Sequence, residues 1–525
     1  MREWRGRSNR RALAHPRPIL SIQAPMILRR VLIANRGEIA LRIVRACHEE
    51  GLEAVAVYSD ADRSSPYVRA ADAAVRIGPP PPAESYLNVD RLLDAARESG
   101  AEAIHPGYGF LAERAEFADA IERAGLVFVG PPGSAIRAMG DKTEARRTMQ
   151  NAGVPIVPGG TEPVSDPRAA LALAEELGYP VLVKASAGGG GRGMRVAATS
   201  GELPGALAIA SSEALKAFGD GAVYLEKLIE RPRHVEIQVL ADFQKTIHLG
   251  ERECSIQRRH QKVVEESPSL AVTPQLRRKM GQAAITAAAA VGYRGAGTCE
   301  FLLAPDGEFY FLEMNTRIQV EHPVTELVYS VDLVREQLRI AGGLTMSVSE
   351  WPMQPRGHSI ECRLTSEDPS NGFLPAAGTI SSLVAPAGPG IRWDAGVEAG
   401  SEVTLHYDSL LAKLIVHAES RGAAIRRMRR ALGELVITGV ATNHGFLQRL
   451  LADPEFGRNE LDIQFLERRG DLLVRGPDAE ADRRIAIAAA LAEHGAGQAG
   501  DRTGGPASRE EGRAWTEAGR LDSLR

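Results

Sequence analysis

Several features are scarce or missing in this chain of 525 residues, and each absence excludes a class of protein. Its four cysteines lie far apart without a CxxC pair, so neither a disulfide framework nor a zinc site is predicted. It has no apolar run of about 18 residues and no N-terminal secretory signal, which excludes a spanning helix and export. With 63 basic against 67 acidic residues, no basic field for nucleic acid covers it. We expect a cytoplasmic protein that binds neither nucleic acid nor membrane.

Lysine is also scarce, since only eight of the 63 basic residues are lysines and the rest are arginines. A sequence that uses arginine for general positive charge is expected to keep lysine where a compact ammonium is required, for example at a single phosphate oxygen. We expect Lys216, Lys245 and Lys279 to be ordinary surface residues. The remaining lysines are candidates for specific roles: Lys142, Lys184, Lys227, Lys262 and Lys413.

Two common nucleotide-binding motifs are missing as well. The stretch GSAIRAMGDKT has six residues between Gly133 and Gly140, where a Walker A motif has four. The stretch ANRGEIA has one glycine where a dinucleotide fingerprint has three. The N-terminal sheet is therefore not expected to bind a nucleotide.

The N-terminal part alternates strands and helices, with strands expected at 27–34 and 53–59 and helices near 88–99 and 113–124. This alternation predicts a parallel, Rossmann-like sheet. The C-terminal part is expected to be α+β, with strands at SIECRLT, GTISSLVAP and SLLAKLIVHA and a helix at 421–435. The predicted class is thus α/β and α+β.

The predicted domains follow from these changes of pattern. Residues 1–26 are rich in arginine and proline and are expected to form a disordered extension. The extension is explained by a start codon assigned too far upstream or, as the weaker alternative, by an organelle transit peptide. The predicted folded domains and tail are 27–138, 139–355 with a lid at about 156–230, 356–468, and 469–525, which holds a helix at 479–494 and a Gly-rich linker.

The segment TCEFLLAPDGEFYFLEMN predicts a β-hairpin with Asp306-Gly307 at its turn. Counting outward from a two-residue turn places Glu300 opposite Glu313, with Cβ atoms about 5 Å apart. Two facing carboxylates are destabilising by themselves, and a divalent cation between them reverses the sign.

Alternate residues after this hairpin are polar. If the strand continues, their side chains point to one face of it. That face is either exposed to solvent or a magnesium site. We favour the magnesium site, because carboxylates mixed with neutral amides suit oxygen ligation of Mg²⁺. These residues are Glu313, Asn315, Arg317, Gln319 and Glu321.

A glycine run follows an expected strand in YPVLVKASAGGGGRGMRV. Glycines let backbone N–H groups approach phosphate oxygens, and Lys184 just before the run supplies a point charge. A flexible linker has the same composition, but the flanking strand and the lysine favour a phosphate-binding loop.

A dense set of donors occurs in GERECSIQRRHQKVVEE. The alternative to a functional loop is a charged loop paired with Glu265 and Glu266. The donors are Arg252, Gln257, Arg258, Arg259, His260, Gln261 and Lys262.

Taken together, these motifs resemble biotin carboxylase, a family of the ATP-grasp superfamily, over about residues 27–467. The matching stretches are RVLIANRGEIALRI, HPGYGFLAE, GDK, KASAGGGGRGMR, ERPRHVEIQVL, CSIQRRHQKVVEE, GAGTCEF, FLEMNTRIQVEHPVTE, IECRLTSEDP, FLP and YDSLLAKLI. Ala187 stands where the family usually has another glycine, and four glycines follow it. The resemblance implies a pre-ATP-grasp N-terminal domain, a central ATP-grasp domain with a glycine-rich lid, and a C-terminal biotin carboxylase domain.

The resemblance also implies a reaction. ATP and bicarbonate form carboxyphosphate, and its CO2 is transferred to N1 of biotin on a carrier protein. The family pattern assigns ATP to Lys142, Lys184, Gly190, Gly191, Glu226, Lys227, Leu228, Ile229, His234, Gln257 and His260. It assigns two Mg²⁺ or Mn²⁺ ions to Glu300, Glu313 and Asn315. It assigns bicarbonate to Lys262, Arg317, Gln319 and the backbone of Val320, with Glu321 as the base, Arg363 at the biotin enolate and Tyr108 nearby.

The chain has no Met-Lys dipeptide, so biotin is expected on a separate carrier protein and not on this chain. The expected partners are that carrier, carboxyltransferase subunits and a second copy of the chain. The expected assembly is an acetyl-CoA or acyl-CoA carboxylase; propionyl-CoA, methylcrotonyl-CoA and pyruvate types are alternatives. Carbamoyl phosphate synthase would need two tandem copies of the unit, and a nucleotide sensor would be expected to lack the metal ligands or the base.

Overall fold

The computed structural model describes residues 28–160, 163–164, 166–185, 194–349 and 351–473, together with Arg483 and Ile487. The chain divides into a compact unit that ends at Leu473 and a second unit from Val474 onward. The expected extension at 1–26, the glycine run with Gly190 and Gly191, and nearly all of the expected tail lie outside the described residues. Among the described residues, no helix is long and apolar enough to span a membrane.

The N-terminal part forms the expected parallel sheet, with strand order β3-β2-β1-β4-β5. Asn88 caps the helix expected near 88–99 by accepting a hydrogen bond from the Arg91 N–H. The strands are β1 (Arg30–Ile33), β2 (Glu53–Ser59), β3 (Ala73–Gly78), β4 (Ala103–His105) and β5 (Val127–Phe128). The helices are α1 (Gly37–Glu49), α2 (Pro66–Ala70), α3 (Val89–Ser99), α4 (Ala115–Arg123) and α5 (Gly133–Gly140).

A large antiparallel sheet of eight strands follows, in the order β13-β12-β9-β10-β11-β14-β21-β19. Its strands are β9 (Arg233–Ala241), β10 (Thr246–Arg258), β11 (Gln261–Ser267), β12 (Gly295–Leu303), β13 (Phe309–Asn315), β14 (His358–Thr365), β19 (Ile391–Ala395) and β21 (Leu410–Ala418). Strands β11 and β14 pair from Val264↔Cys362 to Ser267↔Ser359. The sheet therefore runs without a break across the expected domain boundary at 355/356.

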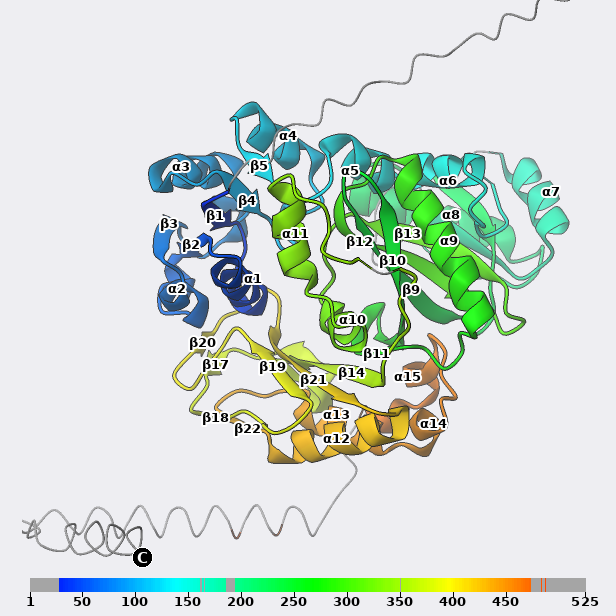
Figure 1. Cartoon of the computed structure of the whole chain (residues 1–525). Coiled ribbons are helices and arrows are strands. Elements are labelled where there is room, and N and C mark those ends of the chain that lie inside the picture. The colour runs from blue at the N-terminus through cyan, green and yellow to red at the C-terminus, as the bar shows by residue number, and fades with distance from the viewer. Residues whose placement is uncertain are drawn as a thin grey trace, which may run out of the picture. The chain divides into compact units, whose positions relative to one another are not determined.

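One face of this sheet packs against long helices. Helix α9 (Pro274–Ala290) covers β9, β10 and β12, where Met280 and Ala284 join a core with Ile237 and Phe301. Helices α12 (Arg421–Glu434) and α13 (His444–Ala452) cover β14 and β21 in the same way, as Figure 1 shows below these strands. We call this the apolar face.

Helices α10 (His322–Tyr329) and α11 (Leu333–Ala341) lie between the two sheets in Figure 1. They share a core with α1 and with the far ends of β9 and β10, through residues such as Ile43, Val328, Leu338 and Ile247. This packing directs the N-terminal end of α10 toward the second face of the large sheet, which we call the cavity face.

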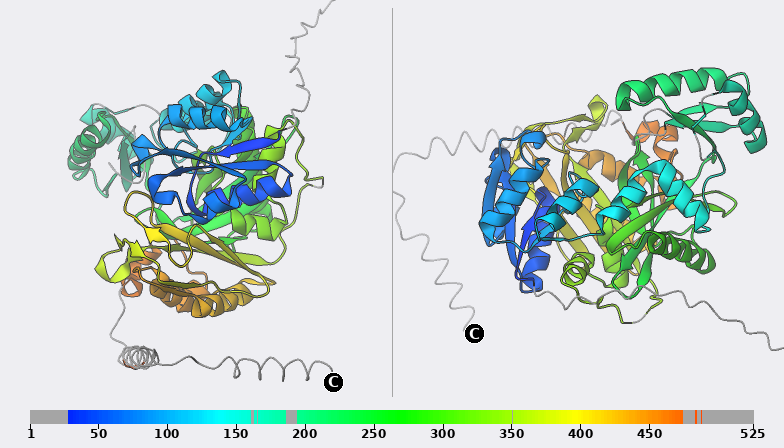
Figure 2. Two further views of the ribbon diagram at one scale, coloured as in Figure 1. Left: turned by 90° about the vertical axis from the view of Figure 1, so that its left-hand side faces the viewer. Right: turned by 90° about the horizontal axis from the view of Figure 1, so that it is seen from above.

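A smaller unit occupies the expected lid region. It has a three-stranded sheet, β7-β6-β8, with a core that includes Val181, Val183 and Leu225. Figure 2 shows its helices α7 and α8 side by side at one edge of the molecule. The elements are α6 (Lys142–Asn151), which leads into it, α7 (Pro167–Leu177), β6 (Val181–Ala185), β7 (Arg195–Ala197), α8 (Leu203–Phe218) and β8 (Val223–Lys227).

The expected strand GTISSLVAP is wrong as a single element. It is divided into β17 (Gly378–Thr379) and β18 (Ser382–Val384), which pair with β20 (Glu402–Val403) and β22 (Val436–Thr438) respectively. The chain changes partner at Ile380, whose buried side chain fills a small separate core with Leu411. The other short elements are β15 (Glu367–Asp368), β16 (Leu374–Pro375), α14 (Pro454–Gly457) and α15 (Phe465–Arg468).

Candidate active site

The expected hairpin, with Asp306-Gly307 in its turn, and the pairing of Glu300 with Glu313 are confirmed, but the turn is longer than the two residues used for the counting. Next to the turn, Leu303 pairs with Phe309, one residue out of the register that a two-residue turn would give. Gly307 adopts φ +90° in a wider loop closed by the Ala304 N–H donating to the Glu308 carbonyl. A register shift between Glu300 and Phe301 then restores the pairing, because a β-bulge adds one residue to β13.

Glu300 and Glu313 end a row of charged residues across four strands of the cavity face. Arg252 pairs with Glu236, Glu236 pairs with Glu300, and Glu300 pairs with Glu313. Arg252 is fully buried, and its Nε lies 2.5 Å from the Glu236 carboxylate. Three carboxylates in a row repel one another, so the row requires further positive charge.

Lys262 supplies that charge from β11. Its Nζ lies 2.5 Å from Glu236, 2.8 Å from Glu300 and 2.6 Å from Glu321. His234 adds a second contact, since its Nε2 lies 2.9 Å from the other oxygen of Glu300. A buried ammonium with three carboxylate partners is held ionised, and the pKa of Lys262 lies well above its usual value.

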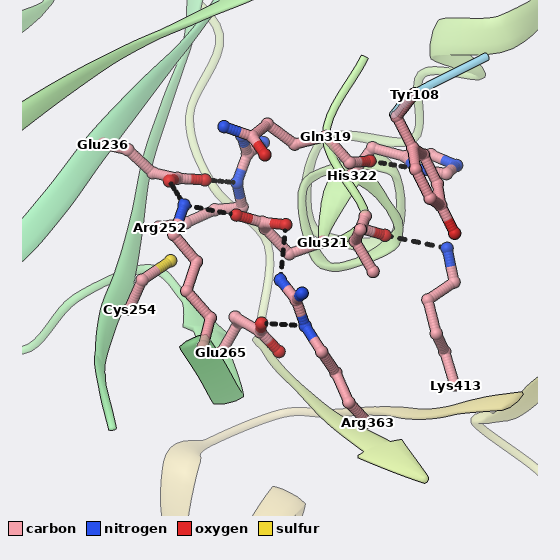
Figure 3. A network of polar contacts seen from close by, with 12 residues as sticks. Tyr108, Glu236, Arg252, Cys254, Glu265, Gln319, Glu321, His322, Arg363 and Lys413 are labelled. Atoms are coloured by element: carbon pink, nitrogen blue, oxygen red, sulfur yellow. Dashed lines mark hydrogen bonds and ion pairs between the residues drawn. The ribbon is translucent and has the colours of Figure 1, made fainter. Parts of the chain in front are cut away.

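Glu321 is the point where this cluster meets a second cation. One of its oxygens accepts from Lys262, and the other accepts from Arg363 Nη2 at 2.8 Å. Figure 3 shows the Arg363 guanidinium between Glu321 and Glu265, whose carboxylate accepts from Arg363 Nε at 2.6 Å. Burial alone would raise the pKa of Glu321, but the charges of Lys262 and Arg363 outweigh it and hold the pKa well below its usual range.

The strand ends before the alternating pattern does, so the condition under which all five polar residues would share one face is not met. Strand β13 ends at Asn315, and residues 316–321 form a loop that leads into α10, with Glu321 at its N-cap. Hydrogen bonds still bring the side chains together: Arg317 donates to Asn315 and Gln319, and Gln319 and Asn315 both donate to Glu300. The loop thus replaces the strand in gathering the site.

The two facing carboxylates have opposite electrostatic environments. Burial alone would raise the pKa of Glu300, but the charges of Lys262 and His234 outweigh it, so the pKa lies well below its usual value. Burial, followed by the charge of Glu300, raises the pKa of Glu313. The Glu313 carboxylate has no hydrogen bond or ion pair with any residue that the structure describes. It is therefore the carboxylate that needs a cation.

The residues present fit a divalent cation beside Glu313. Two carboxylates and the amide oxygen of Asn315 form an oxygen donor set of the kind that Mg²⁺ prefers. Ligand atoms of His234, Glu236 and Glu300 also lie within 4.8 Å of one another. The Lys262 ammonium contacts two of those three residues, so a metal ion fits better on the Glu313 side.

Two cavities meet at Glu313 and Asn315, which line both. The first, of about 520 Å³, contains many of the predicted site residues: Tyr108, His234, Gln257, His260, Lys262, Glu300, Arg317, Gln319, Val320 and Arg363. The second, of about 530 Å³, contains Lys142, Lys184 and Glu226. Glu321 lies at full burial behind the wall of the first cavity.

The predicted hinge residues directly follow Glu226 at the end of β8. Of the described residues, Lys227, Leu228 and Ile229 line neither cavity. The Lys227 ammonium instead donates to the Gly178 and Tyr179 carbonyls at the end of α7. Glu226 is held by Arg146 and by Lys184, whose Nζ lies 2.5 Å away.

Sequence reasoning missed several residues of this site. Glu236 was recognisable, because it stands two residues after His234 on a strand and so shares its face. Glu265 was considered only as part of a charged loop, and Arg252, expected to be a loop donor, is buried among Glu236, Gln238, Thr298 and Thr325. No local signal identified Glu38, which contacts Tyr108 and Lys413 from α1.

Models of three known domains match the chain in succession. They are the biotin carboxylase N-terminal domain at 27–136, the carbamoyl-phosphate synthase L chain ATP-binding domain at 141–349, and the biotin carboxylase C-terminal domain at 361–468. These matches span the N-terminal sheet, the lid and the eight-stranded sheet apart from the first three residues of β14.

Individual proteins match over the same length. A biotin carboxylase of Haemophilus influenzae is 52% identical over 445 residues, which are 84% of this chain and 99% of that protein. A pyruvate carboxylase subunit of Methanothermobacter thermautotrophicus is 51% identical over 452 residues, 86% of this chain and 91% of that protein.

Solved structures agree. The biotin carboxylase domain dimer of Hydrogenobacter thermophilus 2-oxoglutarate carboxylase, in complex with MgADP, ADP and bicarbonate, has a TM-score of 0.81 at 47% identity, covering 86% of this chain and all of that one. A Campylobacter jejuni biotin carboxylase complex with β-γ-ATP has a TM-score of 0.81 at 46% identity, covering 84% and 99%. Because the three domain models follow one another along the chain and full-length relatives are about half identical to it, the chain belongs to the biotin carboxylase family of ATP-grasp enzymes.

Proposed function

We propose that this enzyme uses ATP, Mg²⁺ and bicarbonate to carboxylate biotin carried by a separate protein. The observation that carries the proposal is Glu321, an ionised carboxylate clamped between Lys262 and Arg363 beside the Glu300–Glu313 pair. A proton acceptor, two cations and a candidate metal site are therefore next to one another. That combination suits the activation of bicarbonate against a phosphoryl group.

ATP is assigned to the second cavity and its junction with the first. Lys142 and Lys184 supply positive charge there, and Glu313 and Asn315 line both cavities, so the γ-phosphate is expected at the junction. Bound Mg²⁺ supplies charge neutralisation for phosphoryl transfer. Glu300, Glu313 and Asn315 would hold the ions, and Gly190 and Gly191 are expected to close over the phosphates. His234, Gln257 and His260 complete this assignment, with the backbone from Glu226 to Ile229 at the adenine.

Bicarbonate is assigned to the first cavity, against Lys262, Arg317, Gln319 and the backbone of Val320. When the anion enters, Lys262 and Arg363 are expected to share their hydrogen bonds between it and Glu321. The bicarbonate O–H proton passes to a Glu321 carboxylate oxygen while another bicarbonate oxygen forms its bond to the γ-phosphorus and ADP departs. Cleavage of the C–O bond of carboxyphosphate then gives CO2 and phosphate, the phosphate accepts the N1 proton of biotin, and N1 of the resulting enolate bonds to the CO2. Arg363 is expected to stabilise that enolate, with Tyr108 at the same cavity wall.

The proposed assembly is an acetyl-CoA or acyl-CoA carboxylase in which this chain, as a homodimer, works with a carrier protein and carboxyltransferase subunits. A relative named biotin carboxylase and the description of a neighbour as a dimer support it. A pyruvate carboxylase is the second candidate, favoured by the relative that is named as a pyruvate carboxylase subunit.

The test is ATP hydrolysis by the purified chain, with bicarbonate and free biotin varied separately. We expect slow hydrolysis that depends on bicarbonate and is stimulated by biotin. ATP turnover that is indifferent to bicarbonate would contradict the proposal. Co-purification of native complexes, with identification of the partner chains, distinguishes the acyl-CoA type from the pyruvate type.

A further inference from the structure

Lys413 is a fully buried lysine that the proposed mechanism does not use. It is one of only eight lysines in the chain, and its exposed fraction is 0%. It lies on β21, where it pairs with Arg363 on one side and Asp394 on the other. Burial of an ammonium group costs several kcal/mol unless its partners compensate, so its contacts require an explanation.

The ammonium of Lys413 joins residues from three separate parts of the chain. Its Nζ lies 3.1 Å from Glu38 Oε1 on α1 and donates to the Val320 carbonyl at 2.7 Å. The same Glu38 oxygen accepts a hydrogen bond from the Tyr108 hydroxyl. Figure 3 shows Lys413 reaching toward the hydroxyl end of Tyr108. Lys413 thus connects Tyr108, through Glu38, to the loop before Glu321.

Each backbone carbonyl of residues 318–320 in that loop has a hydrogen-bond partner. The Ile318 carbonyl accepts from Arg317 Nη1 at 3.2 Å, and the Gln319 carbonyl lies 2.8 Å from His322 Nδ1. The Val320 carbonyl accepts from Lys413. The first two donors belong to the loop or to the helix that follows it, so Lys413 is the donor that comes from a distant strand. Because a peptide unit is planar, fixing the Val320 carbonyl also fixes the direction of the Glu321 N–H.

We propose that Lys413 is a positioning residue for the bicarbonate site. It holds the peptide between Val320 and Glu321 so that the Glu321 carboxylate remains between Lys262 and Arg363. Through Glu38 it ties the same peptide to Tyr108, so the contacts of bicarbonate and of biotin share one anchor. This inference rests on the proposed assignment of bicarbonate to Val320 and Glu321.

A purely structural role would be served more simply by an apolar residue, because the next residues on the same face of β21, Leu411 and Ile415, are buried and apolar. Arginine, the residue that this chain prefers elsewhere, would bring a planar fork of larger volume into a site with two single-oxygen acceptors. A compact ammonium meets both acceptors, Glu38 and Val320, from one atom.

The test compares Lys413→Met with a matched control, Lys245→Met. Lys245 also donates to a backbone carbonyl, that of Val348 at 3.0 Å, but it lines neither cavity. We expect Lys413→Met to raise the KM for bicarbonate about 10- to 100-fold in the ATP hydrolysis assay, because misplacement of a reacting group by about 1 Å can cost about 100-fold. The KM for ATP should change less than twofold, and stimulation by biotin should be lost. Lys245→Met should leave both constants at the wild-type values.

Lys413→Gln keeps an amide donor for the Val320 carbonyl and provides the second arm. We expect it to recover a bicarbonate KM between those of wild type and Lys413→Met. Bicarbonate KM values in both Lys413 variants equal to wild type, or KM values for ATP and bicarbonate raised together, would overturn the positioning role. Absence of bicarbonate dependence in the wild-type protein itself would instead contradict the proposed function.

Discussion

The two faces of the eight-stranded sheet are filled in opposite ways. On the apolar face, alternate residues such as Ile237, Phe301 and Leu414 are buried against α9, α12 and α13. On the cavity face, the intervening residues include Glu236, Glu300 and Arg363, and each has a charged partner. The comparison indicates that burial on the apolar face provides the folding energy. That energy allows the cavity face to keep charges in an arrangement that would be unfavourable by itself.

The largest expected effect comes from the cavity face. Glu321→Gln preserves the volume and one oxygen acceptor but removes the proposed proton acceptor. We expect bicarbonate-dependent ATP hydrolysis to fall about 10²- to 10⁴-fold. The measurement is the steady-state kcat with Glu398→Gln, an exposed residue paired with Arg69, as control. Retention of more than a tenth of the wild-type rate would exclude Glu321 as the base.

The apolar face should respond in stability and not in substrate affinity. Leu414→Ala removes a side chain that is 1% exposed, in the core below β14 and β21. We expect unfolding in urea to lose about 2–5 kcal/mol, with KM for bicarbonate unchanged at temperatures where the variant is folded. A changed KM with unchanged stability would reverse the division of roles between the faces.

Glu266 tests an exception, because it is a buried carboxylate that borders the apolar face. Burial would raise the pKa of Glu266, but His358 and Arg421 outweigh it and lower the pKa to about 2. A carboxyl group with a lowered folded-state pKa adds stability that is present above its unfolded pKa and is lost as the pH falls through the folded pKa.

The expected contribution is on the order of 3 kcal/mol at neutral pH and declines between about pH 4.5 and pH 2. Urea unfolding of wild type and Glu266→Gln over this range checks it. The stability difference between the two proteins should shrink on acidification, and a constant difference would show that the carboxylate charge is not involved.

The smallest expected effects are changes in stability, and they distinguish the two paired carboxylates of the cavity face, Glu300 and Glu313. Glu300→Gln removes the charge that Lys262 and His234 contact and should destabilise the metal-free protein by about 1.5–3 kcal/mol. Glu313→Gln relieves the repulsion from Glu300 and should stabilise it by less than about 1 kcal/mol.

Thermal melting with and without Mg²⁺ measures both substitutions. Both variants should lose the rise in melting temperature that Mg²⁺ gives the wild type, and both should lose turnover. A lower metal-free melting temperature in Glu313→Gln would indicate that Glu313 is mainly a structural residue.

Local patterns predicted the elements that depend on local chemistry. The alternation of strands and helices gave the parallel N-terminal sheet, and the helix expected near 88–99 is α3, which Asn88 caps. The facing pair Glu300 and Glu313 was also predicted, although two features combined to give it: a wider loop around Gly307 and a bulge in β13. A turn signal indicates a hairpin but does not determine its register when a bulge follows.

The alternation of polar and apolar residues misled where it continues beyond the end of a strand. Strand β13 ends at Asn315, yet alternation continues in the sequence through Glu321. The segment turns because α10 begins at His322 and packs over the cavity face. The side chains that periodicity would have aligned are instead gathered by hydrogen bonds of Arg317 and Gln319.

The sequence by itself determined the chemistry available: which residues are acids, which few are lysines, and which motifs mark the family. The tertiary structure alone decided their partners. Lys262 meets Glu321, 59 positions away, and Lys413 meets Glu38 on α1, because β11, β14 and β21 are adjacent in one sheet that crosses two expected domains. Contacts of this kind depend on strand order, and strand order is set by the packing of the whole unit, which no short stretch of sequence encodes.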